Sequence, residues 1–252
     1  MSPSVQGAQS FSRTMSVLQQ IADAATAPSR AELMGQCGLT RPTLYRVIAS
    51  LEAEGLIEAT ADNRYKLGGR LISLARQALA ENDIRKVAEP ALMRLRDTTC
   101  ETVHLAIRSG DELVYIDKME SREVVRMSST IGTRVPFHSS GVGKAFLSAL
   151  PPTQADQLIG QLNLAQITPF TTTDRALLQE TVRRARAAGF VRDDQENEAG
   201  IVCFGAAICE APERPVASVS VSVPLFRLAQ DPARYSTPLL ATVAEISAQL
   251  GF

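Results

Sequence analysis

Residues 29–57, SRAELMGQCGLTRPTLYRVIASLEAEGLI, decide how the N-terminal part of this chain folds. Ser29 and Glu32 have the spacing of a capping box, in which the serine hydroxyl accepts from the amide three residues on and the glutamate reaches back. The helix that starts there ends at Gly38, because glycine adopts the left-handed backbone of a helix end without strain. We therefore expect a short helix followed by a tight turn.

A second helix follows this turn. Thr40 is placed to cap it, and Pro42 lies in its first turn, where a missing amide loses no hydrogen bond. Apolar residues then recur with the spacing of one helical stripe: Leu44, Val47, Ile48 and Leu51. The other faces carry small, polar or basic residues, which we take as candidates for DNA contact: Arg41, Pro42, Thr43, Tyr45, Arg46 and Ser50. Two such helices form a helix-turn-helix, with an ordinary helical hairpin as the alternative.

The next residues, LIEATADNRYKLG, predict a β-hairpin with a polar tip around Asp62 and Asn63. Its return strand alternates basic with apolar residues, so Arg64 and Lys66 are expected to touch phosphate or the minor groove. A helix-turn-helix followed at once by a hairpin with basic residues predicts a winged helix-turn-helix DNA-binding domain over residues 11–69.

Composition bounds the rest of the chain. With 252 residues and 45% hydrophobic content, the chain is long enough for two domains with real cores. A net charge of −1 gives no overall attraction to nucleic acid, so DNA affinity must come from local placement of basic residues. No apolar run approaches the ~18–20 residues of a membrane span, and the N-terminus lacks a signal-peptide pattern.

The four cysteines show no C-x-x-C spacing, and with two histidines they make no credible zinc set. We therefore expect no metal and no cofactor, and free thiols in a reducing cytoplasm.

The domain plan follows from breaks in the pattern. Residues 1–10 are polar and are expected to be disordered. Apolar residues from Phe11 to Ala25 predict a supporting first helix, and Gly68-Gly69 ends the winged domain. A helical linker is predicted at residues 70–82, and a second domain at residues 83–252.

The second domain mixes helices and strands. It opens with a helical stripe that starts at Ile84 and contains Pro90, where a kink is expected. We predict strands at 102–108, 113–118, 124–128, 201–208 and 216–223. We predict further helices at 143–150, 153–162, 174–188 and about 238–250. Antiparallel strands with helices gathered around them indicate an α+β fold, GAF-like in class and suited to a sensor domain.

The most informative motif of this domain is the stretch RVPFHSSGVGKAFLSAL, which begins at Arg134. Its GVGK resembles a phosphate-binding loop, but that pattern requires glycine where the chain has His138 and Ser or Thr where it has Ala145. Nucleotide binding is therefore not expected. What remains is a Ser-Ser-Gly turn before a helix, whose free amides favour an anion such as a carboxylate. A capped structural helix is the alternative.

Further polar residues are candidates for the same site. Ser218, Ser220 and Ser222 share one face of a strand, and this face either meets water or lines a small polar pocket. Asp193 is a candidate acceptor for a ligand hydroxyl, although a surface aspartate is commonplace. His104 is more simply structural, because no nucleophile with a supporting acid can be placed beside it. No catalytic motif is present, so the chain is not expected to be an enzyme.

The order of these segments resembles the IclR family of bacterial transcriptional regulators. The resemblance runs from about Phe11 to Leu225 and rests on these blocks: SRTMSVLQQIA, RVIASLEAEGLI, YKLG, ETVHLAIRSGDELVYIDK, IGTRVPFHSSGVGKAFLSAL, GFVRDDQENEAGIVCFGAAI and SVSVSVP. It implies an N-terminal winged helix and a C-terminal effector-binding domain for a small organic acid. It also implies a homodimer or dimer of dimers on double-stranded operator DNA, in the cytoplasm, with no membrane partner.

The resemblance also implies the residues of an effector site. Together with the turn at Ser140 they are Val124, Met127, Val135, Gly141, Val142, Asp193, Ile201, Cys203, Ser220 and Ser222. Many family members have proline after the alanines of the cysteine block, whereas here Ala207 leads directly to Ile208. This departure leaves open whether Cys203 or Cys209 approaches the site.

The leading hypothesis is a transcriptional regulator whose operator binding responds to an acid from sugar-acid or aromatic-acid catabolism. Two alternatives belong to other classes. One is a metabolic enzyme fused to a DNA-binding module, which the missing catalytic constellation disfavours. The other is a thiol-based redox regulator that uses Cys203 and Cys209.

Overall fold

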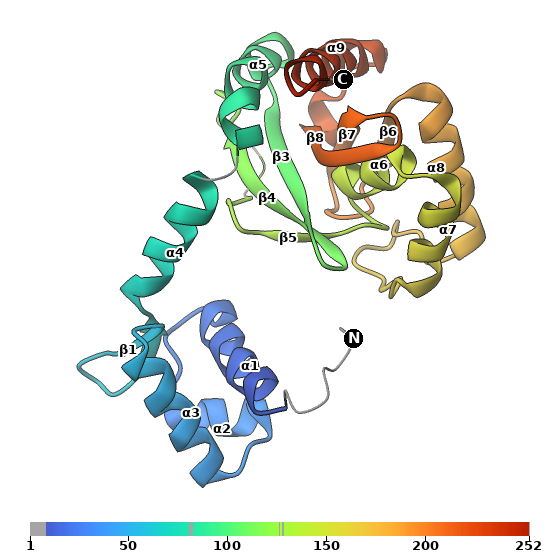
Figure 1. The fold of residues 1–252 in the computed structure, drawn as a ribbon. Helices are drawn as coiled ribbons and strands as arrows, with labels where there is room; N and C mark the ends of the chain where they lie inside the picture. Colours follow the sequence, from blue (N-terminus) through green and yellow to red (C-terminus); the bar gives the residue numbers. More distant parts are fainter. Residues whose placement is uncertain (1–8, 81–82, 126, 128, 252) are drawn as a thin grey trace. The chain divides into compact units, whose positions relative to one another are not determined.

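The chain forms two units, which divide between residues 81 and 82 and are described separately (Figure 1). The computed structural model describes residues 9–80, 83–125, 127 and 129–251.

The first unit packs three helices against a two-stranded antiparallel sheet, as a winged helix requires. Its elements are α1 (Gln9–Asp23), α2 (Arg30–Cys37), α3 (Arg41–Ala53), β1 (Ile57–Ala59) and β2 (Tyr65–Leu67). The predicted stripe of α3 is buried in the core, which consists of Val17, Leu18, Ile21, Leu33, Leu44, Val47, Ile48, Leu51, Ile57 and Tyr65. The other faces of α3 are mostly exposed.

Local capping fixes the ends of these helices. The Ser29 hydroxyl accepts from the Glu32 amide at 3.3 Å, and the Ser29 amide donates to Glu32 Oε2 at 2.6 Å, so the predicted capping box is confirmed. Gly38 has the left-handed backbone expected of it, with φ of 59°. Thr40 stands at the start of α3, but its hydroxyl makes no cap bond and lies 2.9 Å from the Thr43 hydroxyl instead.

The ends of the first unit differ partly from expectation. Residues 1–8 of the predicted disordered N-terminus lie outside the described residues, and α1 already begins at Gln9. Helix α4 (Gly69–Ala80) occupies most of the predicted linker, whose last residues, 81–82, are likewise not described. Ile72 of α4 is 75% exposed.

The second unit is built on a six-stranded antiparallel sheet with the order β5-β4-β3-β8-β7-β6. The strands are β3 (Thr102–Ser109), β4 (Glu112–Met119), β5 (Arg134–Pro136), β6 (Val191–Asp194), β7 (Ile201–Ala211) and β8 (Arg214–Pro224). In the register of β7 and β8, Cys203 lies opposite Ser222 and Phe204 opposite Val221, so neighbouring residues along each strand face opposite sides.

Helices cover both faces of this sheet (Figure 1). Helices α5 (Asp83–Thr99) and α9 (Ala233–Gln249) pack together on the face that carries Phe204, whose ring stacks on Tyr235 of α9 at 5.1 Å. Helix α6 (Gly141–Ala149) lies on the opposite face and contacts β7 and β8. Helices α7 (Pro152–Gln161) and α8 (Arg175–Ala188) pack outside α6, and a 3₁₀ turn (Leu225–Arg227) follows β8.

One predicted strand needs correction, and two short strands, β5 and β6, were not predicted. The described residues of the predicted strand 124–128 form no strand: Val124 and Val125 are 92% and 54% exposed and have no strand beside them. The strand that pairs with β4 is instead β5, in which Val135 lies opposite Leu113. Strand β6 was not predicted, because its sequence VRDD is short and polar and is ordered by pairing with β7.

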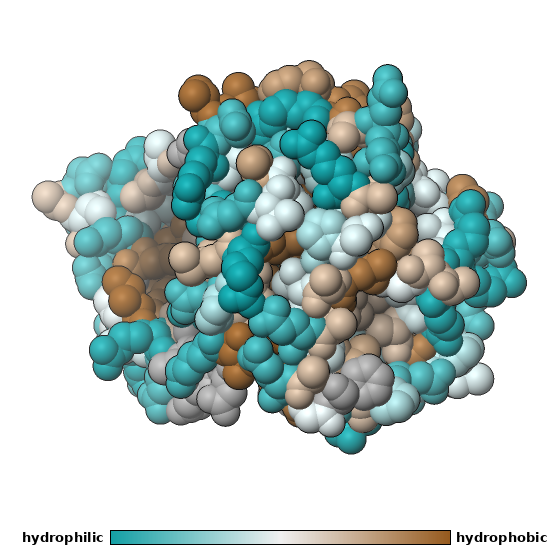
Figure 2. Space-filling model, turned by 90° about the horizontal axis from the view of Figure 1, so that it is seen from above, coloured by the Kyte–Doolittle hydropathy of each residue, from teal (hydrophilic) through white to brown (hydrophobic). Residues whose placement is uncertain are grey.

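None of the described helices is long and apolar enough to cross a membrane. The surface seen in Figure 2 is mainly hydrophilic, with hydrophobic residues scattered over it in small groups.

Candidate functional site

The outer face of α3 presents the residues predicted to contact DNA. Arg41, Pro42, Tyr45, Arg46 and Ser50 are exposed and Thr43 is half-buried, on the side away from the buried stripe. The Ser50 hydroxyl donates to the Arg46 carbonyl at 2.9 Å, and the Arg46 side chain is exposed. The arrangement is that of a recognition helix, which reads base edges with long polar side chains.

Arginines and tyrosines gather beside the start of this helix. The Arg30 guanidinium lies over the Tyr45 ring at 5.0 Å and over the Tyr65 ring at 5.5 Å, and it hydrogen-bonds the Tyr65 hydroxyl. Arg41 lies 5.5 Å from the centre of the Tyr45 ring. Hydrogen bonds from Arg41 and Arg30 lower the pKa of Tyr45. The cluster places positive charge next to α3, and the sequence did not single out Arg30.

A groove of about 550 Å³ separates the start of α1 from α3. One wall carries Thr43, Arg46 and Ser50, and the other carries Arg13 and Thr14 of α1. Arg13 is a second basic residue that the sequence reading missed. Phe11 and Met15 beside it are exposed as well, so the apolar spacing of α1 gave no signal for Arg13.

The two basic residues of the wing already have partners within the first unit. Arg64 donates to the Ala27 carbonyl at 2.8 Å and to Glu32 at 3.1 Å, and it pairs with Asp62 at 3.5 Å. Lys66 pairs with Glu58 across the hairpin at 3.1 Å and is 57% exposed. Lys66 is thus the freer of the two to meet phosphate, while Arg64 ties the wing to α2.

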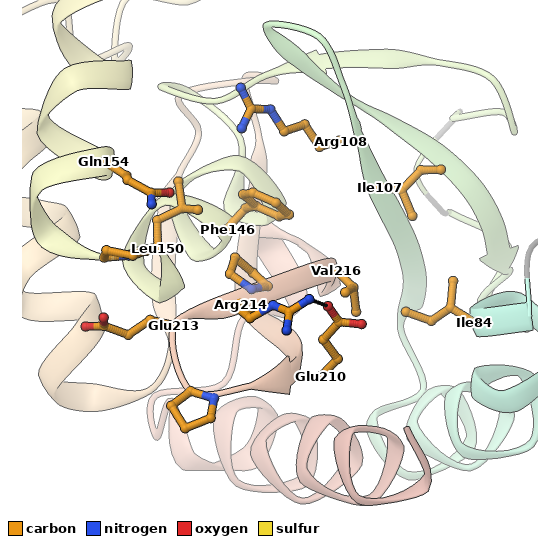
Figure 3. A pocket seen from close by; sticks show the side chains of 13 residues that line it. Ile84, Ile107, Arg108, Phe146, Leu150, Gln154, Glu210, Glu213, Arg214 and Val216 are labelled. Atoms are coloured by element: carbon orange, nitrogen blue, oxygen red, sulfur yellow. Dashed lines mark ion pairs between the residues drawn. The ribbon is translucent and has the colours of Figure 1, made fainter. Parts of the chain in front are cut away.

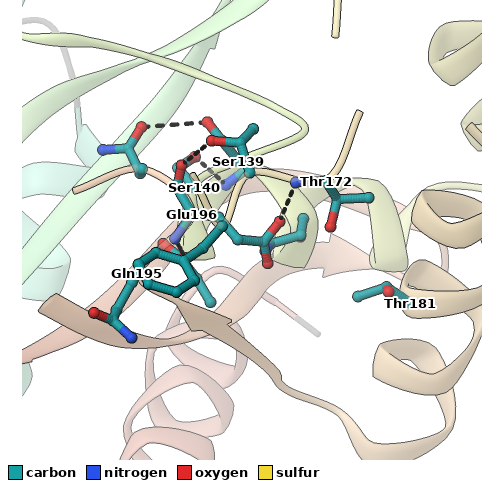
Figure 4. Close-up of polar contacts among 12 residues, drawn as sticks. Ser139, Ser140, Thr172, Thr181, Gln195 and Glu196 are labelled. Atoms are coloured by element: carbon teal, nitrogen blue, oxygen red, sulfur yellow. Dashed lines mark hydrogen bonds and ion pairs between the residues drawn. The ribbon is translucent and has the colours of Figure 1, made fainter. Parts of the chain in front are cut away.

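In the second unit, the N-terminus of α6 forms the centre of the predicted effector site. The Ser140 hydroxyl accepts from the Gly143 amide at 3.1 Å and donates to the Pro136 carbonyl at 2.6 Å, which fixes the turn (Figure 4). A Cβ added at Gly141 would lie 3.1 Å from the Cys203 Cβ and 3.8 Å from that of Asp193. A Cβ added at Gly205 would overlap the Gly141 carbonyl. The helix start therefore rests directly on β7.

Asp193 lies beside this turn and is only 1% exposed. Its Oδ1 accepts from the Glu196 amide at 2.9 Å. Burial raises the pKa of Asp193 to about 6, an effect that nearby Lys144 partly offsets. Asp193 is thus a buried carboxylate next to the turn at Gly141. The alternative of an ordinary surface aspartate is not what the structure shows.

An ion pair holds the loop after β6 against α6. Lys144, which is 1% exposed, pairs with Glu196, and the other Glu196 oxygen accepts from the Thr172 amide at 3.2 Å (Figure 4). The Ser139 hydroxyl donates to Asn197 Oδ1 of the same loop at 3.3 Å. Removing one partner of such a buried pair typically costs roughly 3–5 kcal/mol, because the other charge remains unpaired.

The serine face of β8 is turned inward. Ser218, Ser220 and Ser222 are all buried, on the same side of the sheet as α6, so the prediction of a polar interior is favoured over a solvent-facing row. The Ser222 hydroxyl lies 3.3 Å from the Cys203 sulfur. Ser218 has a buried hydroxyl with no hydrogen-bond partner among the described residues.

His104 extends this polar cluster. Its Nδ1 lies 3.3 Å from the Ser222 hydroxyl and its Nε2 lies 2.5 Å from the Ser129 hydroxyl. Burial lowers the pKa of His104 to about 3, with a contribution from Lys118, so the ring is neutral at physiological pH. The Tyr115 ring stacks on it at 4.4 Å. None of His104, Ser129 and Tyr115 was among the predicted effector residues.

The remaining predicted residues separate into two groups. Val135, Val142 and Met127 are buried, and Val135 and Val142 pack in one core with Tyr115. Ile201 is half-buried at the start of β7. Val124 does not lie where the predicted effector site requires it. It is at the surface, in the bend that replaces the predicted strand, away from the buried residues of the site.

The structure also separates the two cysteines of the redox alternative. Cys203 lies opposite Ser222 and Cys209 opposite Pro215 on the same extended strand, six residues apart. At ~3.3 Å per residue their Cα atoms are roughly 20 Å apart, far beyond the reach of a disulfide. Burial raises the pKa of the Cys203 thiol, which makes it a poor nucleophile. Cys203, not Cys209, adjoins the α6 turn.

Another depression, of about 710 Å³, lies among Ile107, Arg108, Phe146, Leu150 and the turn between β7 and β8 (Figure 3). Within it Arg214 pairs with Glu210 at 2.6 Å. It shares no residue with the predicted effector set. Among the described residues, no group of three or more histidine, cysteine or carboxylate side chains could hold a metal ion.

A winged helix-turn-helix unit followed by an α+β unit with a polar interior defines a class: two-domain DNA-binding regulators. The family model of the IclR helix-turn-helix domain matches residues 10–61, and that of the bacterial transcriptional regulator IclR C-terminal domain matches residues 76–248. The chain belongs to the IclR family of bacterial transcriptional regulators, which are DNA-binding proteins and not enzymes.

Relatives and solved structures agree with this assignment. The transcriptional repressor IclR of Escherichia coli K12 is 28% identical over 232 residues, 91% of this chain and 85% of that protein. The repressor AllR of Klebsiella pneumoniae is 32% identical over 231 residues, again 91% and 85%. The structure of Thermotoga maritima IclR matches with a TM-score of 0.75 at 30% identity, covering 96% of this chain and 98% of that one. An IclR homolog from Microbacterium hydrocarbonoxydans, complexed with 4-hydroxybenzoate, has the same fold, with a TM-score of 0.78, 23% identity and the same coverage.

Proposed function

We propose that a small carboxylate metabolite binds at the N-terminus of α6 and changes the affinity of this regulator for its operator. The observation that carries the proposal is the contact of the Gly141 turn with Asp193 and Cys203. Amides at a helix start favour an anion, because their hydrogen atoms and the helix dipole point toward it. The ligand carboxylate would meet the amides of the turn from Ser140 to Val142.

The rest of the lining would set the class of acid. Asp193 is mostly ionised at pH 7 and repels a carboxylate, so it faces the other end of the ligand and accepts from a hydroxyl there. Ser220 and Ser222 add hydroxyls, and Val135 and Met127 close the apolar side. Hydroxy or keto acids from sugar-acid or aromatic-acid catabolism fit this mixed lining. The Microbacterium protein, which binds 4-hydroxybenzoate, supplies one probe.

A thermal-shift screen of carboxylate metabolites tests the proposal, since a ligand that binds only the native state raises its melting temperature. The acids found should then be titrated by calorimetry into wild type and Asp193→Ala, with and without operator DNA. Asp193→Ala is expected to weaken a hydroxylated acid by about 1.5–3 kcal/mol, the range for hydrogen bonds to charged groups, and a deoxy analogue far less.

Coupling between the two sites must be reciprocal, so operator DNA should change acid affinity by the factor by which acid changes operator affinity. Equal binding of both ligands by wild type and Asp193→Ala would show that the site lies elsewhere. Operator affinity that no carboxylate changes would overturn the proposed regulation.

A further inference from the structure

Tyr115 lies on the serine face of the sheet, although neither the spacing of its neighbours nor the family resemblance pointed to it. In the register of the sheet it lies opposite Ala106, which in turn lies opposite Ser218. Directly opposed residues share a face, so Tyr115 belongs to the side that carries Ser220 and Ser222 and that α6 covers. Tyr115 is 4% exposed.

The Tyr115 ring is held in place by a neighbouring aromatic ring. It stacks on His104 with 4.4 Å between ring centres and 24° between ring planes. His104 is itself fixed by Ser129 on one nitrogen and by Ser222 on the other. The Tyr115 ring therefore stacks on a neutral ring that is fixed on both sides, and through His104 it is linked to the serine that contacts Cys203.

The Tyr115 hydroxyl forms no hydrogen bond with any described residue. Burial raises the pKa of Tyr115, and the next contributions come from Cys203, Asp193 and Glu198. Tyr115 packs in one buried cluster with Val135 and Val142, two residues of the predicted effector site, so its ring borders that site. Among the described residues, Ser218 Oγ is the fully buried side-chain atom without a hydrogen-bond partner, and the Tyr115 oxygen is not such an atom. The Tyr115 hydroxyl therefore keeps accessible surface, where water or a bound molecule can reach it.

Tyr235 shows the contrast within the same unit. It is equally buried, on the opposite face of the sheet, and its hydroxyl donates to the Arg227 carbonyl at 3.3 Å and accepts from the Ala229 amide at 3.2 Å. The hydroxyl of Tyr235 is thus satisfied within the fold.

We propose that the Tyr115 hydroxyl is a ligand-binding group that, with Asp193, selects acids carrying a hydroxyl away from the carboxylate. The inference rests on the proposed function and adds a specificity-determining residue to it. A phenol donates to the ligand oxygen while the Asp193 carboxylate accepts from a ligand hydroxyl, so the two groups together recognise an alcohol.

The test uses Tyr115→Phe, which keeps the ring stacked on His104 and removes only the hydroxyl. Two pairs of probes, 4-hydroxybenzoate with benzoate and 4-hydroxybutyrate with butyrate, are titrated by calorimetry into the full-length protein. Tyr115→Phe should weaken the hydroxylated member of the pair that wild type binds by about tenfold and the deoxy member less than about twofold. Tyr235→Phe is the matched control and should leave the preference for the hydroxylated acid unchanged.

Two outcomes separate the failures. If wild type prefers a hydroxylated acid and Tyr115→Phe keeps that preference, the assignment of Tyr115 is wrong while the proposed effector site stands. Binding of none of the four acids by wild type would overturn the proposed acid class, and the role of Tyr115 with it.

Discussion

Asp193 shows how burial changes what a single side chain does. The ordinary pKa of an aspartate is 3.8, and burial raises that of Asp193 to about 6. A native pKa above the unfolded one means that the folded protein binds more protons between these values, so the free energy of unfolding falls as pH rises from about 4 to about 6. The stabilisation is present at low pH and is lost through this window.

Asp193→Asn should remove this titration. The difference between the wild-type and variant free energies of unfolding is expected to change by roughly 3 kcal/mol across the window, since one pKa unit corresponds to about 1.4 kcal/mol. Urea unfolding at intervals between pH 4 and 7.5 measures it. Asp194→Asn is the control, because Asp194 is exposed on the same strand and pairs with Arg192 at 2.7 Å. A slope in Asp193→Asn equal to that of wild type would contradict the assignment.

Arg46 is the residue on which operator recognition is expected to depend most. It projects from α3 beside Thr43 and Ser50 and forms one wall of the groove toward α1. Arg46→Ala should weaken operator binding by roughly 1–3 kcal/mol and relax base preference, if the guanidinium contacts a guanine edge. Fluorescence anisotropy with operator and scrambled duplexes measures both effects. Arg76→Ala, on exposed α4, should change neither; an unchanged operator preference in Arg46→Ala would refute the role.

At the scale of elements, local signals were predictable and tertiary ones were not. Helices α2 and α3 followed from the Ser29 capping box and the α3 stripe, because both are set by residues within a few positions. Strand β6 depends on pairing with β7, and the apolar residues at 124–125 lack a partner, so neither could be read locally.

The same distinction explains the candidate site. Four residues of the site lie in sequence motifs that could be recognised, and the structure brings them together: Gly141, Asp193, Cys203 and Ser222. His104 and Tyr115 are brought to the site only by the register of β3, β4 and β8. This register includes a shift between Leu105 and Ala106 that could not be predicted from the sequence.

The wing is the element whose contact with DNA is expected to be electrostatic. Lys66→Ala should weaken binding to every sequence alike and flatten the dependence of log K on log salt by about 0.9, the value for one lost phosphate contact. Glu58→Ala frees Lys66 from its 3.1 Å ion pair and is the opposite control, since it should not flatten the slope. Titrations at several salt concentrations decide; an unchanged slope in Lys66→Ala means that the wing does not touch phosphate.

At the scale of the whole molecule, one winged helix reads too few base pairs to define an operator. We expect the functional species on DNA to be at least a dimer. A two-fold dimer requires an inverted-repeat operator whose half-sites are about one ~34 Å turn, or a multiple of it, apart. Sedimentation with and without operator, together with footprinting, tests this. Protection of a single half-site at saturation by a monomer would contradict the prediction.

The overlap that any side chain at Gly205 would create with the Gly141 carbonyl also limits how this sensor can evolve. The helix start and β7 touch backbone to backbone, so the anchoring half of the proposed site tolerates no side chain at Gly205 without displacing the helix, and one at Gly141 only if Cys203 moves aside. A lineage that acquires a new signal must therefore keep this half and vary side chains on the facing strands. Divergence in what such proteins sense should accumulate at positions such as Tyr115 and His104.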